Sequence, residues 1–457
     1  MLKKSYEMDL CHGPLWRKIL VFSIPLMLSG ILQLLFNAAD IVVVGQYAGS
    51  TSLAAVGATS SLINLLTNLF MGLSIGSNVL IARYYGAKNI KATSETLHTS
   101  ILLSLISGLA LSFIGVMLAD PLLTLMGTPN DVLRLATLYM KIYFLGMPAM
   151  MLYNFGSAIL RAIGDTKRPL YFLACAGVIN VVLNLCFVIV FKMNVAGVAL
   201  ATVIAQYVSA FMIIVSLMHQ EGACHLDLHA LRLYPDKVIE ILKIGLPAGL
   251  QGSIFSISNV LIQSSINGFG SIAMAGNTAA SNIESFIYIS MNSIHQTALS
   301  FTSQNYGAKQ YHRIGKILAI CLALVSGIGL GMGFFAFQFG SSLLSIYSSD
   351  PEVISYGLKR MSIICTSYFL CGMMDVIVGS LRGLGFSMLP MIVSLIGACG
   401  LRILWIFTIF KAHHSLWTLY ISYPITWIIT FTAHLICYWI IRRKYLQHPC
   451  PQEIQAI

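Results

Sequence analysis

The sequence predicts an all-α integral membrane protein of about twelve transmembrane helices, in two six-helix lobes related by a pseudo-two-fold axis along the membrane normal. Three observations support this fold class: a very apolar composition, a series of long apolar stretches and an internal repeat. Hydrophobic residues make up 57 % of the 457 residues and charged residues only 9 %. Soluble domains carry about 25 % charged residues, so this composition excludes a water-soluble fold.

Apolar stretches follow one another along the chain, and each supplies the roughly 20 residues that a spanning helix needs. The twelve expected spans are residues 17–44, 54–82, 96–119, 133–157, 169–191, 196–218, 238–266, 270–302, 315–339, 354–380, 387–410 and 416–441. Pro25 and Pro247 interrupt the first span of each half, where a proline removes a helical hydrogen bond and bends the helix. We expect Pro25 to act as a conformational hinge.

The internal repeat predicts how the spans are grouped. Tyr85-Gly86-Ala87-Lys88 returns 221 residues later as Tyr306-Gly307-Ala308-Lys309. Because six spans is an even number, the second copy enters the membrane in the same direction as the first, which is typical of transporters with parallel repeats. The expected parts are an N-terminal lobe at 1–218, a polar cytoplasmic connector at 219–243, a C-terminal lobe at 238–441 and a cytoplasmic tail at 442–457. A central cavity is expected between the lobes.

The net charge of +11 follows from where the basic residues lie. Most of the 27 Lys and Arg residues fall in the termini and in every second loop. Cytoplasmic loops of membrane proteins are enriched in these residues. We therefore expect a multi-pass protein of the cell inner (plasma) membrane with both termini cytoplasmic, whose partner is the lipid bilayer and not nucleic acid.

The ten cysteines show neither C-x-x-C pairs nor zinc-ligand spacing, so neither a disulfide framework nor a cysteine metal site is expected. No removable signal peptide is evident, because the first apolar run is longer than a signal-peptide core and lacks a small-residue cleavage site.

Charged residues inside a membrane are costly and usually mark a functional path. Asp40 lies in the outer half of the first span, and Asn180 and Asn184 share one face of the fifth span by their i, i+4 spacing. Tyr139 and Thr202 lie at a similar depth. A carboxylate with amide, hydroxyl and phenol oxygens is what a proton or Na⁺ site needs. The alternative is that Asp40 caps a helix end and the Asn residues join helices.

A second polar cluster is expected in the C-terminal lobe. Glu284 and Arg402 lie near mid-span at matching depths, so we expect them to pair, and His295 follows Glu284 by eleven residues on the same helical stripe. Asp375 occupies the repeat position of Asn154. The alternatives are an ordinary ion pair between Asp375 and Arg382 at the cytoplasmic edge, and a packing role for His295.

Several motifs resemble the multidrug and toxic compound extrusion (MATE) family, bacterial type, over essentially the whole chain. They are Asn37-Ala38-Ala39-Asp40, Val44-Gly45-Gln46, Leu53-Ala54-Ala55-Val56-Gly57, Ala82-Arg83-Tyr84-Tyr85-Gly86-Ala87-Lys88, Leu160-Arg161-Ala162-Ile163-Gly164-Asp165, Gln304-Asn305-Tyr306-Gly307-Ala308-Lys309 and Leu381-Arg382-Gly383-Leu384-Gly385. The resemblance implies a V-shaped, twelve-helix multidrug efflux antiporter. It would export small organic, often cationic, compounds and other xenobiotics in exchange for inward Na⁺ or H⁺ by alternating access.

The resemblance also implies roles for individual residues. Asp40 would be the cation-coupling carboxylate, and the Pro25 kink would bend as the site changes occupancy. The residues expected to cluster with Asp40 are Tyr139, Asn154, Asn180, Asn184 and Thr202. The only metal ion expected is Na⁺, held by Asp40, Asn180, Asn184 and Thr202. No cofactor, no catalytic residue and a monomeric protein are expected.

The chain departs from the family pattern at two places. Several relatives carry a second Asp where this chain has Asn184, which affects the strength or identity of cation binding. One branch has an acidic residue on the seventh span, whereas the carboxylates of this C-terminal lobe are Glu284 and Asp375.

Three other classes of protein remain as alternatives. A lipid-linked oligosaccharide flippase of the same broader superfamily usually has more spans and a strongly basic central cavity. A symporter of the major facilitator type has six plus six helices, but its loop signature after the second span is absent here. An intramembrane enzyme lacks support, since no H-E-x-x-H motif occurs in the sequence.

Overall fold

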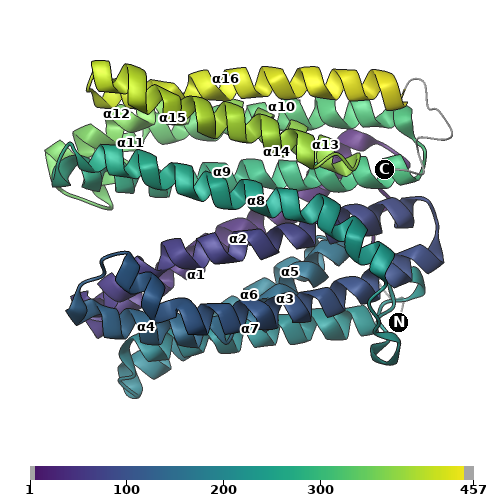
Figure 1. The fold of residues 1–457 in the computed structure, drawn as a ribbon, viewed down its shortest axis with the longest axis horizontal. Coiled ribbons are helices and arrows are strands. Elements are labelled where there is room, and N and C mark those ends of the chain that lie inside the picture. The colour runs from purple at the N-terminus through teal and green to yellow at the C-terminus, as the bar shows by residue number, and fades with distance from the viewer. Residues whose placement is uncertain (1–5, 447–457) are drawn as a thin grey trace. The chain divides into compact units, whose positions relative to one another are not determined.

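The computed structural model describes residues 6–446, and the regular structure of that range is entirely helical (Figure 1). The helices of the first repeat are α1 (Leu15–Val43), α2 (Ser50–Gly86), α3 (Ile90–Leu125), α4 (Asn130–Phe144), α5 (Met147–Ala162), α6 (Lys167–Leu185) and α7 (Asn194–Met218). Those of the second are α8 (Pro235–Asn267), α9 (Ser271–Gly307), α10 (Tyr311–Gln338), α11 (Gly340–Ser345), α12 (Pro351–Ser367), α13 (Phe369–Gly383), α14 (Met388–Ser394), α15 (Leu401–Trp405) and α16 (Leu416–Ile441).

Short π-helical turns extend several of these helices. They are η1 (Val44–Ala48), η2 (Cys186–Val190), η5 (Leu395–Gly400), η6 (Ile406–Phe410) and η7 (Arg442–Leu446). Two 3₁₀ turns, η3 (Gly222–Cys224) and η4 (Leu228–Ala230), lie in the polar segment between the repeats.

The predicted all-helical membrane fold is confirmed. Within residues 6–446, nine helical segments are long and apolar enough to cross a membrane, and two bent helix pairs raise the number to eleven. The remaining expected span is α9, whose 37 residues include too many Ser, Asn, Thr and Gln for the same apolar criterion. Every expected span thus coincides with a helix or a bent pair.

Two expected spans are bent rather than single helices. α4 and α5 meet at 47°, and α12 and α13 meet at 43°. In the first pair, Pro148 occupies the first turn of α5 and cannot donate a backbone hydrogen bond to the preceding helix. The bend follows from this missing donor.

The chain forms two compact units. Unit 1 comprises the N-terminal residues up to Asp9 and Leu28–Ser253, and unit 2 comprises Leu10–Met27 and the chain from Ile254 onward. α1 and α8 therefore each contribute to both units. The expected connector at 219–243 contains η3, η4 and the start of α8, and the expected tail at 442–457 lies outside the described residues beyond residue 446. The lobe boundaries expected from the sequence stay a prediction.

In unit 1, α2 and the first part of α8 approach so closely that only glycine fits between them. A Cβ atom built on Gly72 would lie 2.2 Å from the backbone nitrogen of Gly249, and one on Gly76 would lie 2.4 Å from the carbonyl oxygen of Ile241. Membrane helices commonly associate through small residues in this way. α5 packs against α2, α3 and α7, and α6 packs against α7.

In unit 2, α9 is the central helix, since it packs against α10, α12 and α13. Its buried side chains include many polar ones, among them Asn277, Glu284, His295 and Gln304. Buried polar side chains need hydrogen-bond partners, and these partners define much of the interior of the unit.

Candidate functional site: a carboxylate in unit 1 and an ion pair in unit 2

The close approach of α1 and α6 positions the first candidate site. A Cβ atom built on Gly177 of α6 would lie 1.8 Å from Cε2 of Phe36 on α1. Gly177 therefore lets the aromatic ring pack directly against the α6 backbone. Asp40 follows Phe36 by one helical turn, and Asn180 and Asn184 follow Gly177 by one and two turns, so the same contact brings these polar side chains together.

The half-buried carboxylate of Asp40 accepts hydrogen bonds from two other helices. Nδ2 of Asn184 on α6 donates to Oδ1 of Asp40, and Oγ1 of Thr202 on α7 lies 3.5 Å from Oδ2. The Thr202 hydroxyl also lies 3.0 Å from the carbonyl oxygen of Val198, and Nδ2 of Asn180 donates to it at 3.3 Å. Asp40, Asn180, Asn184 and Thr202 thus form one connected group.

Two amide oxygen atoms of this group accept no hydrogen bond from the described residues. Oδ1 of Asn180 and Oδ1 of Asn184 are buried and have no hydrogen-bond partner among the described residues. Both side chains are nearly inaccessible, with exposed fractions of 5 % and 1 %. Unpaired buried acceptors are costly, and they sit beside a carboxylate. These oxygen atoms fit the hard ligands that a Na⁺ ion takes and equally the acceptor that a protonated carboxylate needs.

Two other predicted members differ in their relation to Asp40. Tyr139 is buried, its ring stacks on that of Tyr143 at a centroid distance of 5.9 Å, and both phenols lie close enough to interact electrostatically with Asp40. The amide of Asn154 donates instead to the carbonyl oxygen of Met150 in its own helix, at 2.8 Å. Within the described residues, no hydrogen bond joins Asn154 to the Asp40 group.

A buried ion pair dominates the interior of unit 2. Arg360 of α12 donates from Nε and Nη2 to the two carboxylate oxygens of Glu284 on α9, at 2.8 and 2.6 Å. Its third nitrogen, Nη1, donates to Oδ1 of Asn277 at 2.7 Å, and Nδ2 of Asn277 donates to Oε1 of Gln263 at 3.0 Å. Bidentate guanidinium–carboxylate pairs are the strongest of their kind.

The expected pair between Glu284 and Arg402 is therefore wrong. Arg402 of α15 donates to Oγ1 of Thr426 at 3.0 Å, and its guanidinium lies 4.1 Å from the ring centroid of Tyr423 on α16. A cation stacked on an aromatic face and bonded to a hydroxyl is stabilised without a carboxylate.

His295 and Asp375 do come together, but through the backbone of Asp375. Nδ1 of His295 lies 2.6 Å from the carbonyl oxygen of Asp375, so the ring donates to α13. A Cβ atom built on Gly379 would lie 2.7 Å from the carbonyl oxygen of His295, which shows how tightly the two helices pack. The carboxylate of Asp375 interacts electrostatically with Arg382 and Tyr288. These contacts match the packing alternative for His295.

The ion pair borders a cavity of about 290 Å³. Its polar and aromatic lining residues include Asn259, Gln263, Asn277, Glu284, Tyr288, Arg360, Tyr423 and Trp427. Arg360 is the residue that the sequence reasoning missed. The available signal was its position six residues inside the expected span 354–380, which also contains Asp375.

A duplicated bundle of membrane-spanning helices with a half-buried carboxylate in one unit and a buried ion pair beside a cavity in the other is the arrangement of an integral membrane transporter. The profile of the MatE family matches residues 25–186 and 247–408. The chain belongs to this family, the MATE family, which confirms the resemblance found in its motifs.

Individual relatives match along most of their length. The chain is 27 % identical over 395 residues to "Probable multidrug resistance protein YoeA" of Bacillus subtilis, covering 85 % of each chain. It is 27 % identical over 360 residues to the "FAD transporter" of Shewanella oneidensis, covering 76 % of this chain and 77 % of the relative. The solved structure of a MOP superfamily transporter from Pyrococcus furiosus superposes with a TM-score of 0.91 at 22 % identity, covering 98 % of this chain and 100 % of that one. This last match supports the fold.

Proposed function

We propose that the protein is a secondary active multidrug antiporter that exports small organic compounds, often cationic, in exchange for inward Na⁺ or H⁺ by alternating access. The observation that carries this proposal is the Asp40 group: one half-buried carboxylate in the membrane with two unpartnered amide oxygens beside it. The name of the Bacillus subtilis relative supports the substrate class. The family match does not favour the flippase alternative.

Asp40 is the coupling residue in this proposal. Without a cation, its charge is balanced by the N–H of Asn184 and the hydroxyl of Thr202. A bound proton or Na⁺ would remove the need for that N–H donor, so the Asn184 amide would turn and present Oδ1 instead. A proton on Asp40 would be donated to this oxygen. A Na⁺ ion would be held by oxygens of Asp40, Asn180, Asn184 and Thr202.

Pro25 is the proposed hinge for this change. It lies fifteen residues before Asp40 on α1 and two residues before Met27, where α1 passes from unit 2 into unit 1. Proline leaves one backbone hydrogen bond of the helix unmade, so bending costs least there. Cation binding at Asp40 and substrate binding would then favour different shapes of α1, which is the differential affinity that exchange requires.

We also propose that the protein is a monomer in the plasma membrane, with both termini in the cytoplasm. The positions of the basic residues support this orientation, because most fall in alternate loops. Lys3 and Lys4 lie outside the described residues.

The test is efflux from proteoliposomes of purified protein under separately imposed Na⁺ and pH gradients. A fluorescent organic cation and a flavin nucleotide serve as cationic and anionic probes. We expect efflux of the fluorescent organic cation under one of the two gradients. The gradient that drives efflux identifies the coupling ion as Na⁺ or H⁺. Asp40→Asn should abolish it, whereas Asp131→Asn, which removes an exposed carboxylate at the start of α4, should not.

Gradient-driven efflux that persists in Asp40→Asn would overturn the coupling role of this residue. Absence of efflux of both probes by the wild type under both gradients would overturn the antiporter proposal, and lipid-linked substrates would be tested next.

A further inference from the structure

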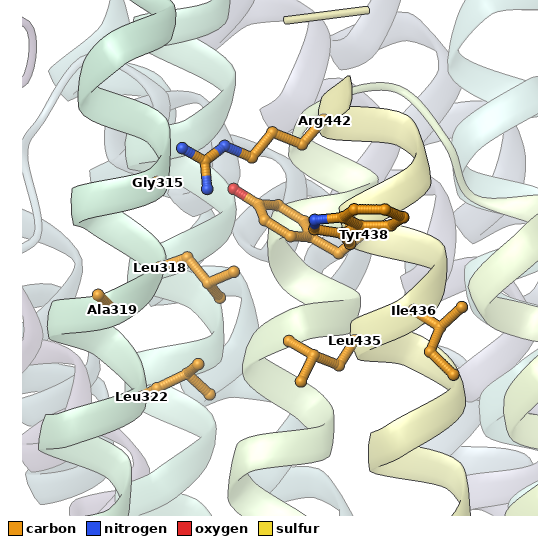
Figure 2. A pocket seen from close by; sticks show the side chains of 9 residues that line it. Gly315, Leu318, Ala319, Leu322, Leu435, Ile436, Tyr438 and Arg442 are labelled. Carbon is orange, nitrogen blue, oxygen red and sulfur yellow. The ribbon is translucent and has the colours of Figure 1, made fainter. Parts of the chain in front are cut away.

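An apolar groove runs between α10 and α16 of unit 2 (Figure 2). Both helices pack against α13, and the groove between them has a volume of about 460 Å³. Leu318 and Leu322 line it from α10, and Leu435 and Ile436 line it from α16. From Gly315 to Leu322 it extends for about 10 Å, at the helical rise of roughly 1.5 Å per residue.

One end of the groove is polar and offers hydrogen-bond donors from two side chains. Figure 2 shows the guanidinium of Arg442 beside the hydroxyl of Tyr438, with the apolar side chains farther along. A Cβ atom built on Gly315 would lie 3.5 Å from Cζ of Arg442, so the guanidinium rests on the bare backbone of α10. Tyr438 is only 4 % exposed, and its hydroxyl has no hydrogen-bond partner among the described residues. A buried hydroxyl without a partner points to a missing acceptor.

The surroundings of this end place it at a membrane interface and give it a positive charge. Trp439 is 57 % exposed, and the guanidinium of Arg443 lies 5.5 Å from its ring centroid. Exposed tryptophans are enriched where lipid headgroups begin. Lys316 and Lys444 are also exposed at this end. Neither α10 nor α16 contains an Asp or Glu residue.

The equivalent end of the first repeat differs in its hydrogen bonding. α7 is the last helix of the first repeat, as α16 is of the second. The polar side chains at the end of α7 are satisfied within unit 1, because Arg168 donates to Ser216 Oγ at 3.0 Å and to Gln220 Oε1 at 2.7 Å.

Among the described residues, the Tyr438 hydroxyl has no such partner within unit 2. At the 221-residue offset of the repeat, Leu389 occupies the position of Arg168, and its side chain cannot form a hydrogen bond. This end of unit 2 therefore leaves an unpartnered hydroxyl beside the Arg442 guanidinium at the groove.

We propose that this groove binds an anionic phospholipid of the membrane leaflet at this end of α16. One acyl chain lies along Leu318, Leu322 and Leu435, and a phosphate oxygen accepts hydrogen bonds from the Tyr438 hydroxyl and the Arg442 guanidinium. The basic residues around the groove and the lack of carboxylates on α10 and α16 favour a lipid with net negative charge. The proposal requires that the chain spans a membrane, and it is independent of the transport function.

The experiment is lipid binding to the purified full-length protein in detergent. Native mass spectrometry counts bound dioleoyl phosphatidylglycerol, with dioleoyl phosphatidylcholine and inorganic phosphate as comparisons, and thermal unfolding reports stabilisation. We expect specific binding of phosphatidylglycerol and a stabilisation that inorganic phosphate does not reproduce. Arg442→Gln should weaken binding about fivefold, the effect expected of one basic residue near an anionic lipid surface. Arg443→Gln, the control with the same loss of charge next to the groove, should change it less.

Tyr438→Phe separates binding from folding. Removing an unpartnered buried hydroxyl should leave the lipid-free unfolding temperature unchanged or raise it, while the phosphatidylglycerol-induced shift becomes smaller. Ala319→Trp keeps both donors but fills the groove, and should also reduce binding. Equal binding by wild type, Arg442→Gln and Tyr438→Phe would overturn the proposal. An equal loss of lipid binding in Arg443→Gln would also overturn it, because it indicates a general electrostatic attraction of the lipid to this surface. Equal stabilisation by inorganic phosphate would overturn it as well, because it indicates a phosphate site that holds no lipid chain.

Discussion

Arg360 holds both carboxylate oxygens of Glu284, at 2.8 and 2.6 Å, in a part of unit 2 where both side chains are less than 10 % exposed. A buried pair of this kind is costly to break, because removing one partner leaves the other charge buried and uncompensated.

Glu284→Gln and Arg360→Gln should each destabilise the protein by about 3–5 kcal/mol, and the double variant should lose much less than the sum. A double-mutant cycle by thermal or chemical unfolding in detergent measures this coupling. Glu284→Gln combined with Arg402→Gln is the control and should be additive to within about 0.5 kcal/mol. A larger coupling of Glu284 with Arg402 than with Arg360 would contradict the observed pairing.

Asn184→Leu should lower the initial rate of gradient-driven efflux about tenfold or more, because Asp40 then loses a hydrogen bond to a charged group. Rates in proteoliposomes check this. Asn154→Leu is the matched control, since the Asn154 amide donates within its own helix, to the carbonyl oxygen of Met150, and its rate should stay within about twofold of the wild type. An equal loss in both variants would show that Asn154 belongs to the coupling group after all.

Gly177→Ala should destabilise the protein by about 1–3 kcal/mol, because the new methyl group overlaps the ring of Phe36 and pushes α6 from α1. Phe36→Leu in the same chain should restore part of the loss. Unfolding temperatures of the two single variants and the double variant measure this. Gly327→Ala on α10 is the control, since a Cβ atom there meets no heavy atom within 4 Å. If Phe36→Leu does not restore any stability to Gly177→Ala, the destabilisation does not arise from the contact with the Phe36 ring.

Arg168→Gln should cost about 3–5 kcal/mol, since Asp165 is fully buried and pairs with Arg168. The backbone N–H groups of Lys167 and Arg168 also donate to Asp165, at 3.0 and 3.1 Å, so the carboxylate stays buried in the variant. The unfolding free energy provides the measurement. Arg134→Gln, at an exposed position, should leave it unchanged, and an equal effect of the two substitutions would rule out a specific role for the pair.

The sequence was sufficient to predict the spans, because a membrane-spanning helix needs a long apolar stretch and little else. It was also sufficient to group Asp40 with Asn184, since i, i+4 spacing and common depth are set by helix geometry. It did not predict the bend at Pro148, because a proline inside an apolar run is compatible with a straight or a broken helix.

The partner of Glu284 could not be read from depth alone. Arg402 lies between two π-helical turns, η5 and η6, and each such turn inserts an extra residue and rotates the face that follows. Its side chain therefore reaches Tyr423 and Thr426, whereas the predicted pairing of Arg402 with Glu284 depends on a regular helix. Arg360 lies on α12, which packs directly against α9, a neighbourhood that spacing along the chain does not reveal.

The division of α1 and α8 between the two units has a consequence for biosynthesis. Leu10–Met27 belongs to unit 2 although it is made before Leu28–Ser253 of unit 1, and residues up to Ser253, from the second repeat, complete unit 1. Unit 1 is therefore incomplete until the ribosome has begun the second repeat, and Leu10–Met27 waits for the synthesis of all of Leu28–Ser253 before the rest of its own unit follows.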